Sequence, residues 1–354
     1  MSIFEHMRRN NSRELLFFEE QSLKLKAIIA VDSIVLGPAN ASAKLFHYKD
    51  EDEAVADALD IAYYNSLRAA LLKRSMGGGA IVLLGKPEEV KSEMYFRALG
   101  IFLNRRGGEL FMSISKGVSY KDLKYVRKES EYILGMEESH GGLGQIYVNR
   151  AKGMIKGLKA VAKHKLKSGS LKGLKIVVQG IGDLGSQLVR QLIEEGADLT
   201  VTDKIYDRIK VIQDEVRDIK IEKPDKIYET KCDIFCSCAS EKMISTESLS
   251  KLKCKILTGG TNQPLKNIKD AEMLKQNNIL YVPGYIINGG DIIQMTNEIE
   301  GYKNDKVETE LDDIYKNTLS LLEESDASGT VLCRLATEKA EEYVNGVSAI
   351  KMLR

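Results

Sequence analysis

Three glycines and a downstream carboxylate are the residues of this 354-residue chain whose types and spacing most directly suggest chemistry. Gly180, Gly182 and Gly185 have G-x-G-x-x-G spacing and follow an apolar run that begins at Lys175. The first glycine permits a tight turn, the second lets the backbone approach a pyrophosphate, and the third lets helix and strand pack closely. Asp203 follows about 20 residues later, where a carboxylate accepts hydrogen bonds from an adenosine ribose. Because this charge would repel a 2′-phosphate, the pattern predicts binding of NAD rather than NADP.

A second interpretation of the glycines stays open. They could serve packing alone, in a strand–turn–helix unit that no longer binds a dinucleotide. Asp183 favours that alternative, because it lies beside the expected diphosphate and brings a negative charge to it.

Alternating strands and helices must position these residues. The pattern predicts an α/β fold, with an N-terminal α/β domain, a C-terminal doubly wound parallel sheet of the Rossmann type and a cleft between them. The glycine-rich segment 135–144 is the expected hinge. The predicted domains are 1–135, 136–330 and a C-terminal helix over 331–354 that packs back on the N-terminal domain.

Several local predictions bear on the site. The periodicity predicts a helix over 51–73 that ends at a glycine run, and Gly77, Gly78 and Gly79 are expected in a loop that is flexible or closely approached. A loop is also expected over 35–42, after the strand at 24–32. A helix over 88–104 and two long helices over roughly 290–324 and 330–350 complete the set.

Composition excludes some classes of function. A net charge of +1 gives no strong attraction to nucleic acid or to an anionic membrane. No apolar run approaches the length of a membrane span, so a cytoplasmic protein is expected. Five cysteines, an odd number, argue against a disulfide scaffold. Cys232, Cys236 and Cys238 lie close enough in sequence to suggest a metal site. Buried structural thiols are the favoured interpretation, and no metal is expected.

Several sequence stretches resemble the leucine dehydrogenase branch of the Glu/Leu/Phe/Val dehydrogenase family. The resemblance covers nearly the whole chain, and it is carried by LKAIIAVDSIVLGPA, DEAVADALDIA, KSEMYFRALGIFL, VVQGIGDLGSQLVRQLIEEGADLTVTD, CDIFCSCAS, KILTGGTNQPL and YVPGYIINGGDII. It implies NAD-dependent oxidative deamination of L-amino acids. It also implies an N-terminal domain with much of the substrate site, a Rossmann domain, and symmetric oligomers.

The substrate side departs from the family pattern. Arg68 stands where the family has a carboxylate-binding lysine, Ala80 where it has the lysine that activates water, and Ser115 where it has a proton-shuttling aspartate. One general acid or base contributes roughly 10² to 10⁴ in rate, so ordinary amino-acid deamination is not expected. Further departures are Ala41 and Ser42 for a glycine pair, Arg150 for a threonine, and Asp291 for an apolar residue.

The cofactor side matches better, since Asn262 and Asn288 match family asparagines near the nicotinamide and its ribose. The residues expected to contact the cofactor are Gly180, Gly182, Asp183, Leu184, Gly185, Asp203, Cys238, Ala239, Asn262 and Asn288.

Two functions therefore remain. The first is a repurposed NAD-dependent oxidoreductase acting on an imine or a related small carboxylated substrate. In it Arg68 clamps a carboxylate, Asp291 meets a cationic or hydroxylated group, and Lys116, next to Ser115, is the candidate proton donor. The alternative interpretation, that Lys116 is an ordinary surface residue, is somewhat favoured over a role as proton donor. The second function is a catalytically inactive pseudoenzyme that serves as a regulatory or partner subunit. The sequence favours the oxidoreductase.

Overall fold

The chain forms two compact units in the computed structural model, which describes residues 3–10, 12–216 and 219–352. The first unit takes residues up to Gln145, then Gln294–Asn304, then residues from Ala340 onward. The second takes Ile146–Ile293 and Asp305–Lys339. The chain thus enters each unit more than once. The predicted domain limits of 1–135, 136–330 and 331–354 stay predictions.

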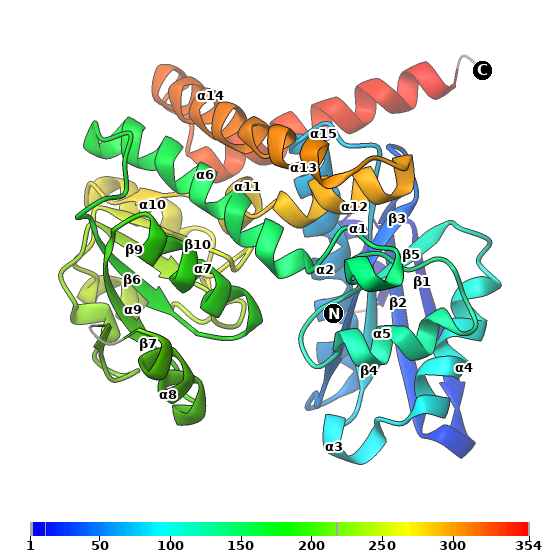
Figure 1. Ribbon diagram of the computed structural model, residues 1–354. Coiled ribbons are helices and arrows are strands. Elements are labelled where there is room, and N and C mark those ends of the chain that lie inside the picture. The colour runs from blue at the N-terminus through cyan, green and yellow to red at the C-terminus, as the bar shows by residue number, and fades with distance from the viewer. Residues whose placement is uncertain (1–2, 11, 217–218, 353–354) are drawn as a thin grey trace. The chain divides into compact units, whose positions relative to one another are not determined.

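A mixed five-stranded sheet is the centre of the first unit, in the order β1-β2-β4-β3-β5 (Figure 1). β2 runs antiparallel to both β1 and β4, whereas β3 is parallel to β4 and β5. The predicted loop after β2 is wrong from Ala39 onward, because this stretch pairs on both sides as a central strand. The strands are β1 (Glu14–Glu20), β2 (Leu25–Ser33), β3 (Ala39–Phe46), β4 (Gly77–Leu84) and β5 (Leu110–Ile114).

Helix α2 (Glu51–Leu71) covers one face of this sheet. Its N-terminus is fixed by Asp50, whose side chain accepts a hydrogen bond from Glu53 N at 2.9 Å, and by acidic residues in the first turn that suit the helix dipole. The helix lies so close to β4 that a Cβ on Gly78 would stand 2.2 Å from the Ala62 carbonyl oxygen. The predicted loop over Gly77–Gly79 is wrong, because all three glycines lie in β4, and Gly78 allows the close approach of α2.

Shorter helices complete the first unit. α5 (Tyr120–Arg127) begins with a capping box between Ser119 and Asp122. The predicted helix over 88–104 is two helices, because Ser92 is extended and caps the second through Tyr95 N. The other helices that start in this unit are α1 (Ile3–Asn10), α3 (Pro87–Val90) and α4 (Glu93–Asn104).

The second unit contains a parallel six-stranded sheet in the order β11-β10-β9-β6-β7-β8, which confirms the predicted Rossmann-type doubly wound architecture. Its inner strands are largely buried and mainly apolar, as expected for strands with both faces covered. The strands are β6 (Lys175–Gln179), β7 (Asp198–Thr202), β8 (Lys220–Ile221), β9 (Ile234–Ser237), β10 (Ile256–Gly259) and β11 (Leu280–Tyr281).

Helices pack around this sheet, and α6 (Ile146–Leu166) lies alongside α14 (Asp312–Ser328) (Figure 1). The predicted single helix over 290–324 is wrong, because the chain breaks into α12 (Gly290–Glu300), α13 (Asn304–Glu310) and α14 after a turn at Gly301 with φ +76°. The remaining helices are α7 (Asp183–Glu194), α8 (Tyr206–Glu215), α9 (Thr246–Lys251), α10 (Asp270–Gln276), α11 (Gly284–Ile287) and α15 (Leu332–Lys351).

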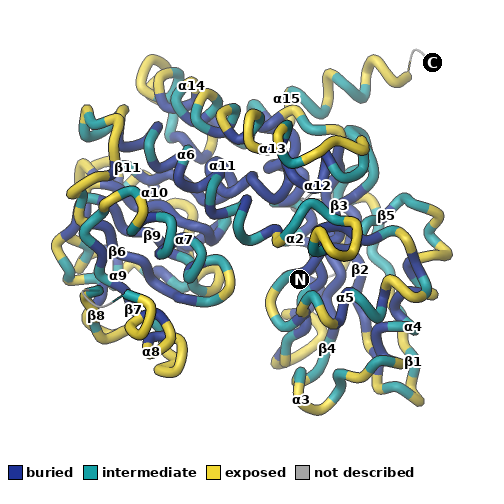
Figure 2. Tube along the Cα trace, in the orientation of Figure 1, coloured by how far each residue is buried: buried dark blue, intermediate teal, exposed yellow. Residues whose placement is uncertain are grey.

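The buried residues follow the strands and the inner faces of the helices (Figure 2). In the first unit one apolar cluster joins β2, β4 and α2, and in the second another surrounds Phe235 and Leu257. Among the described residues, no helix is long and apolar enough to span a bilayer.

Candidate functional site

The glycine turn of the second unit has the geometry that a dinucleotide needs. Gly180 has φ +94°, and a Cβ there would lie 2.9 Å from the backbone of Cys238 and Ala239. A Cβ on Gly185 would meet the Gly180 carbonyl oxygen at 2.0 Å, so this glycine lets α7 pack on the turn. At Gly182 a Cβ would find only Arg208 Nη1 within 4 Å, at 3.7 Å. Open space above the backbone at the N-terminus of α7 fits a diphosphate.

Asp203, at the end of β7, ties this turn together. Its Oδ2 accepts a hydrogen bond from Ile181 N at 2.7 Å, and its Oδ1 accepts one from Ile205 N at 2.8 Å. Arg208 Nη1 lies 3.5 Å from Oδ2. The structure thus brings the glycines and the predicted ribose ligand together, with Asp183 exposed in the first turn of α7 and Leu184 next to it.

Two asparagines form a polar cluster at the end of β10. The Asn288 side-chain amide donates to the Gly260 carbonyl oxygen and to Asn262 Oδ1, both at 2.8 Å. Asn288 is fully buried. Ala239 belongs to the same region, because its carbonyl accepts a hydrogen bond from the Thr261 hydroxyl at 3.0 Å. These residues follow the carboxyl ends of parallel strands, where ligands of such sheets bind.

Arg150 and Asp291, two departures from the family pattern, contact each other. Arg150 Nη1 lies 3.9 Å from Asp291 Oδ2, and Arg150 Nη2 donates to the Gly260 carbonyl oxygen at 3.1 Å. The Asp291 side chain is only 5% exposed, and its Oδ1 also accepts a hydrogen bond from Ile292 N. The carboxylate predicted to meet a substrate therefore has a cationic partner within the chain, and that arginine donates to the same Gly260 carbonyl as Asn288.

In the first unit, Arg68 belongs to a buried polar network between α2 and the sheet. Arg68 Nη1 donates to Asn65 Oδ1 at 3.1 Å, and Asn65 Nδ2 donates to Ser42 Oγ and to the Gly79 carbonyl, both at 3.0 Å. Ser113 continues the network, because its hydroxyl donates to Asn40 Oδ1 at 2.7 Å. Arg68 is 2% exposed, so its guanidinium is held in place.

Ala80 borders this network but belongs to the apolar core. It pairs in register with Ser42 on β3 and is 0% exposed, in the cluster that contains Ala58, Ala62 and Val82. The position at which the resemblance implies a catalytic lysine is therefore filled by close packing of α2 on β4.

Ser115 and Lys116 lie just beyond the end of β5 and are more exposed than Ser113 of the Arg68 network. Lys116 is exposed, and its ammonium lies 4.4 Å from the centroid of the Phe46 ring, a cation–π distance. This contact favours the surface interpretation of Lys116.

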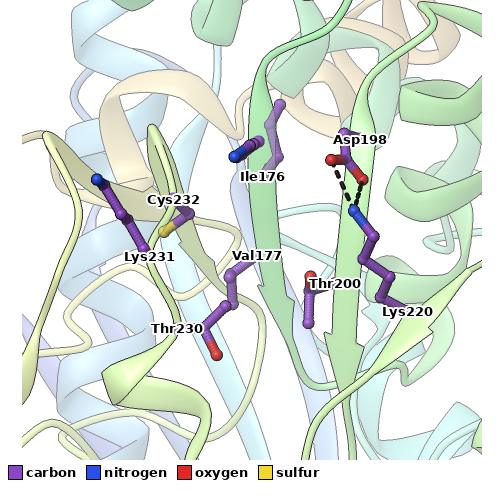
Figure 3. Close-up of a pocket in the computed structure, with 9 residues that line it drawn as sticks. Ile176, Val177, Asp198, Thr200, Lys220, Thr230, Lys231 and Cys232 are labelled. Carbon is purple, nitrogen blue, oxygen red and sulfur yellow. Dashed lines mark hydrogen bonds and ion pairs between the residues drawn. The ribbon is translucent and has the colours of Figure 1, made fainter.

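A pocket of about 200 Å³ lies at the amino ends of the strands of the second sheet (Figure 3). Its lining includes Lys175 and Asp198, the first residues of β6 and β7, and Asp198 forms an ion pair with Lys220 at 2.6 Å. These are the amino ends of the strands, whereas the glycine turn and Asp203 follow the carboxyl ends. The pocket is therefore separate from the predicted cofactor site.

The five cysteines are free thiols of the second unit, and all are buried except Cys238, which is half-buried. Cys236 lies in β9, and Cys232 lies two residues before that strand. Burial raises the pKa of Cys238 to about 11, which keeps it a neutral thiol near the turn. In the described part of the chain, no cluster of three or more His, Cys, Asp or Glu residues has the arrangement of a metal site.

Comparison with known proteins identifies the family. The family model described as Glutamate/Leucine/Phenylalanine/Valine dehydrogenase matches residues 199–340. Leucine dehydrogenase from Thermoactinomyces intermedius is 32% identical over 351 residues, which cover 97% of this chain and 94% of that protein. The chain belongs to the Glu/Leu/Phe/Val dehydrogenase family. Within it, the similarity to leucine dehydrogenases, including that of Bacillus subtilis at 32% identity over 97% of this chain and 94% of that protein, confirms the branch expected from the sequence.

Solved structures of dehydrogenases share the fold. L-tryptophan dehydrogenase from Nostoc punctiforme superposes with a TM-score of 0.77 at 27% identity, covering 98% of this chain and 99% of that one. A hetero-hexameric glutamate dehydrogenase from Thermus thermophilus superposes with a TM-score of 0.82 at 15% identity, covering 98% of this chain and 95% of that one, and shows the fold alone.

Three residues of the site were missed by sequence reasoning. Asn65 on α2 and Ser113 on β5 are buried polar residues, and buried polar side chains signal a hydrogen-bond network. Arg208 lies in the first turn of α8, five residues after Asp203, and its role was not visible without the geometry of the turn.

Proposed function

We propose that this family member is an NAD(H)-dependent oxidoreductase that acts on an imine or a related small carboxylated substrate, without a water-activating lysine. The observation that carries the proposal is the geometry at the glycine turn: open space above Gly182, and Asp203 held by two backbone N–H groups. A turn kept for packing alone explains Gly180 and Gly185, but it does not require the open backbone at Gly182.

Bound NADH would supply a hydride to the imine carbon, the imine nitrogen would take a proton, and the products would be an amine and NAD⁺. The chain's part is to bind and orient. The backbone at Gly182 and the N-terminus of α7 would hold the diphosphate, and Asp203 would orient the ribose. Asn288 and Asn262 would serve the nicotinamide end. The Arg68 guanidinium, fixed by Asn65, presents a planar fork that suits a carboxylate.

A fluorescence titration with NADH tests the cofactor part. The chain has no tryptophan, so its own emission is weak. We expect saturable binding in the micromolar range, and Asp203→Ala should weaken it by about tenfold or more, the effect of losing a charged hydrogen-bond acceptor. Asp198→Ala, at the opposite end of β7, is the matched control and should leave binding unchanged. Absence of NADH binding at millimolar cofactor would contradict the proposal.

The alternative, a pseudoenzyme that serves as a regulatory or partner subunit, is favoured by one observation, the closed packing of Ala80. A screen of imines and of 2-oxo acids with ammonia, followed by NADH oxidation, separates the two. Turnover that disappears in Arg68→Ala and is partly restored in Arg68→Lys would contradict the pseudoenzyme. NADH binding without turnover of any of these substrates would support it.

A further inference from the structure

Arg208 occupies a place at the glycine turn that cofactor binding has not yet explained. It lies in the first turn of α8, and its Nη1 atom is 3.5 Å from Asp203 Oδ2. The same atom lies 3.7 Å from the position that a Cβ on Gly182 would take. The guanidinium therefore lies between the predicted ribose ligand and the glycine above which a diphosphate fits.

This placement changes the charge that a cofactor would meet. Asp203 alone would repel a 2′-phosphate, but both of its oxygens accept backbone N–H groups, and a guanidinium lies beside it. Lys204, next in sequence, adds a second positive charge, whereas Asp183 and Asp207 are the acidic groups of the two neighbouring helix starts. At Asp203 itself the charge is offset by an ion pair.

The Arg208 side chain is also able to bind a ligand. It is 47% exposed, whereas the Asp203 side chain is 7% exposed. Because about half of the side chain is exposed, its remaining donors are accessible to a ligand, and a guanidinium binds a phosphate with two parallel hydrogen bonds. In folds of this type an acidic residue binds the ribose 2′-hydroxyl of NAD, or a nearby arginine accommodates the 2′-phosphate of NADP, and this chain has a residue of each kind at the turn.

We propose that Arg208 is a cofactor-binding residue that sets the dinucleotide specificity of this chain: it offsets Asp203 and binds a 2′-phosphate, so that NADPH binds as well as NADH. The inference rests on the proposed function, because it needs a dinucleotide at the glycine turn. It extends the NAD preference that Asp203 alone indicates.

Paired titrations with NADH and NADPH test it, using the wild-type chain, Arg208→Ala and Arg190→Ala. Arg190 is the control, because it removes one positive charge from the same unit and pairs with Glu215 instead of Asp203. We expect wild-type dissociation constants for the two cofactors within about tenfold of each other. Arg208→Ala should raise the ratio of the NADPH dissociation constant to the NADH dissociation constant by about tenfold or more. The NADH dissociation constant itself should change by less than about threefold. Arg190→Ala should leave the ratio unchanged.

Other outcomes overturn the inference. An equal loss of both cofactors in Arg208→Ala would place the guanidinium on the diphosphate that they share. An unchanged ratio, or a wild-type chain that binds NADH and excludes NADPH, would leave Asp203 as the determinant of specificity. Binding of neither cofactor by the wild-type chain would instead contradict the proposed function itself, so the two failures are distinguishable.

Discussion

Ala80 shows how one residue ties catalytic chemistry to packing. Its methyl group is fully buried among Ala58, Ala62 and other apolar residues under α2, and its register neighbour Ser42 is bonded to Asn65. A lysine placed here would bring a charge into a core that contains no acidic partner among the residues of that cluster. The substitution that the family resemblance invites therefore conflicts with the packing around it.

We expect Ala80→Lys to lower the free energy of unfolding by about 3 kcal/mol or more, because a buried charge without a partner is costly. Urea denaturation of the purified variant measures the change. Ala327→Lys, on the exposed side of α14, adds the same side chain and should change stability by less than about 0.5 kcal/mol. A stable Ala80→Lys variant would show that the strand can open to admit the longer side chain.

At the scale of elements, α12 holds the glycine-rich segment that was predicted to be a hinge. Glu298 on this helix accepts hydrogen bonds from Gly135 N at 2.7 Å and from Leu143 N at 3.1 Å, and Gln294 donates to Glu298 Oε1 and to the Gly144 carbonyl. Burial raises the pKa of Glu298 above its usual value. One side chain thus ties both ends of the segment.

We expect Glu298→Ala to speed amide hydrogen exchange over residues 135–144 by about tenfold or more, since two backbone donors lose their acceptor. Exchange followed by mass spectrometry localises the effect. Glu323→Ala, an exposed change on α14, serves as the control. Unchanged protection of the segment would mean that its own turns, and not α12, hold it.

Element types were well predicted where the hydrophobic pattern is clearly periodic or continuous. They were poorly predicted where tertiary contacts determine the local structure. Helix α2 and strands β2, β5, β6 and β9 follow from periodicity and apolar runs. Gly77–Gly79 belong to β4 because they pair with strands distant in sequence, and no local pattern shows this pairing. The cofactor turn could be predicted because its glycines have a steric reason at fixed spacing, whereas the Arg68 network joins residues more than 70 positions apart.

At the scale of the whole molecule, one buried carboxyl group links stability to pH. Burial, with a smaller contribution from the charge of Glu341 on α15, raises the pKa of Asp32 from 3.8 to about 7, although a hydrogen bond with Ser66 acts in the opposite direction. The folded chain therefore binds a proton that the unfolded chain releases near pH 4. The contribution of Asp32 to stability is complete below pH 4 and is lost as the pH rises toward 7.

We expect Asp32→Asn to remove this decline and to make the chain more stable than the wild type at pH 8, by up to about 4 kcal/mol. Unfolding in urea at pH 5 and at pH 8 measures the difference. Asp60→Asn, on α2, is a control that makes the same substitution at another aspartate of the first unit. Equal gains at both pH values would locate the effect outside the titration of Asp32.

The hydrogen bonds of Glu298 also determine when the first unit can complete its fold during synthesis. Gly135 precedes its partner by 163 residues, and the first unit still needs residues from Ala340 onward. A ribosome adding about 5 to 20 residues per second would take about 8 to 30 seconds to cover that interval. The first unit therefore begins to emerge first and completes its fold last. Its N-terminal part stays incomplete for that interval, during which chaperones can bind it.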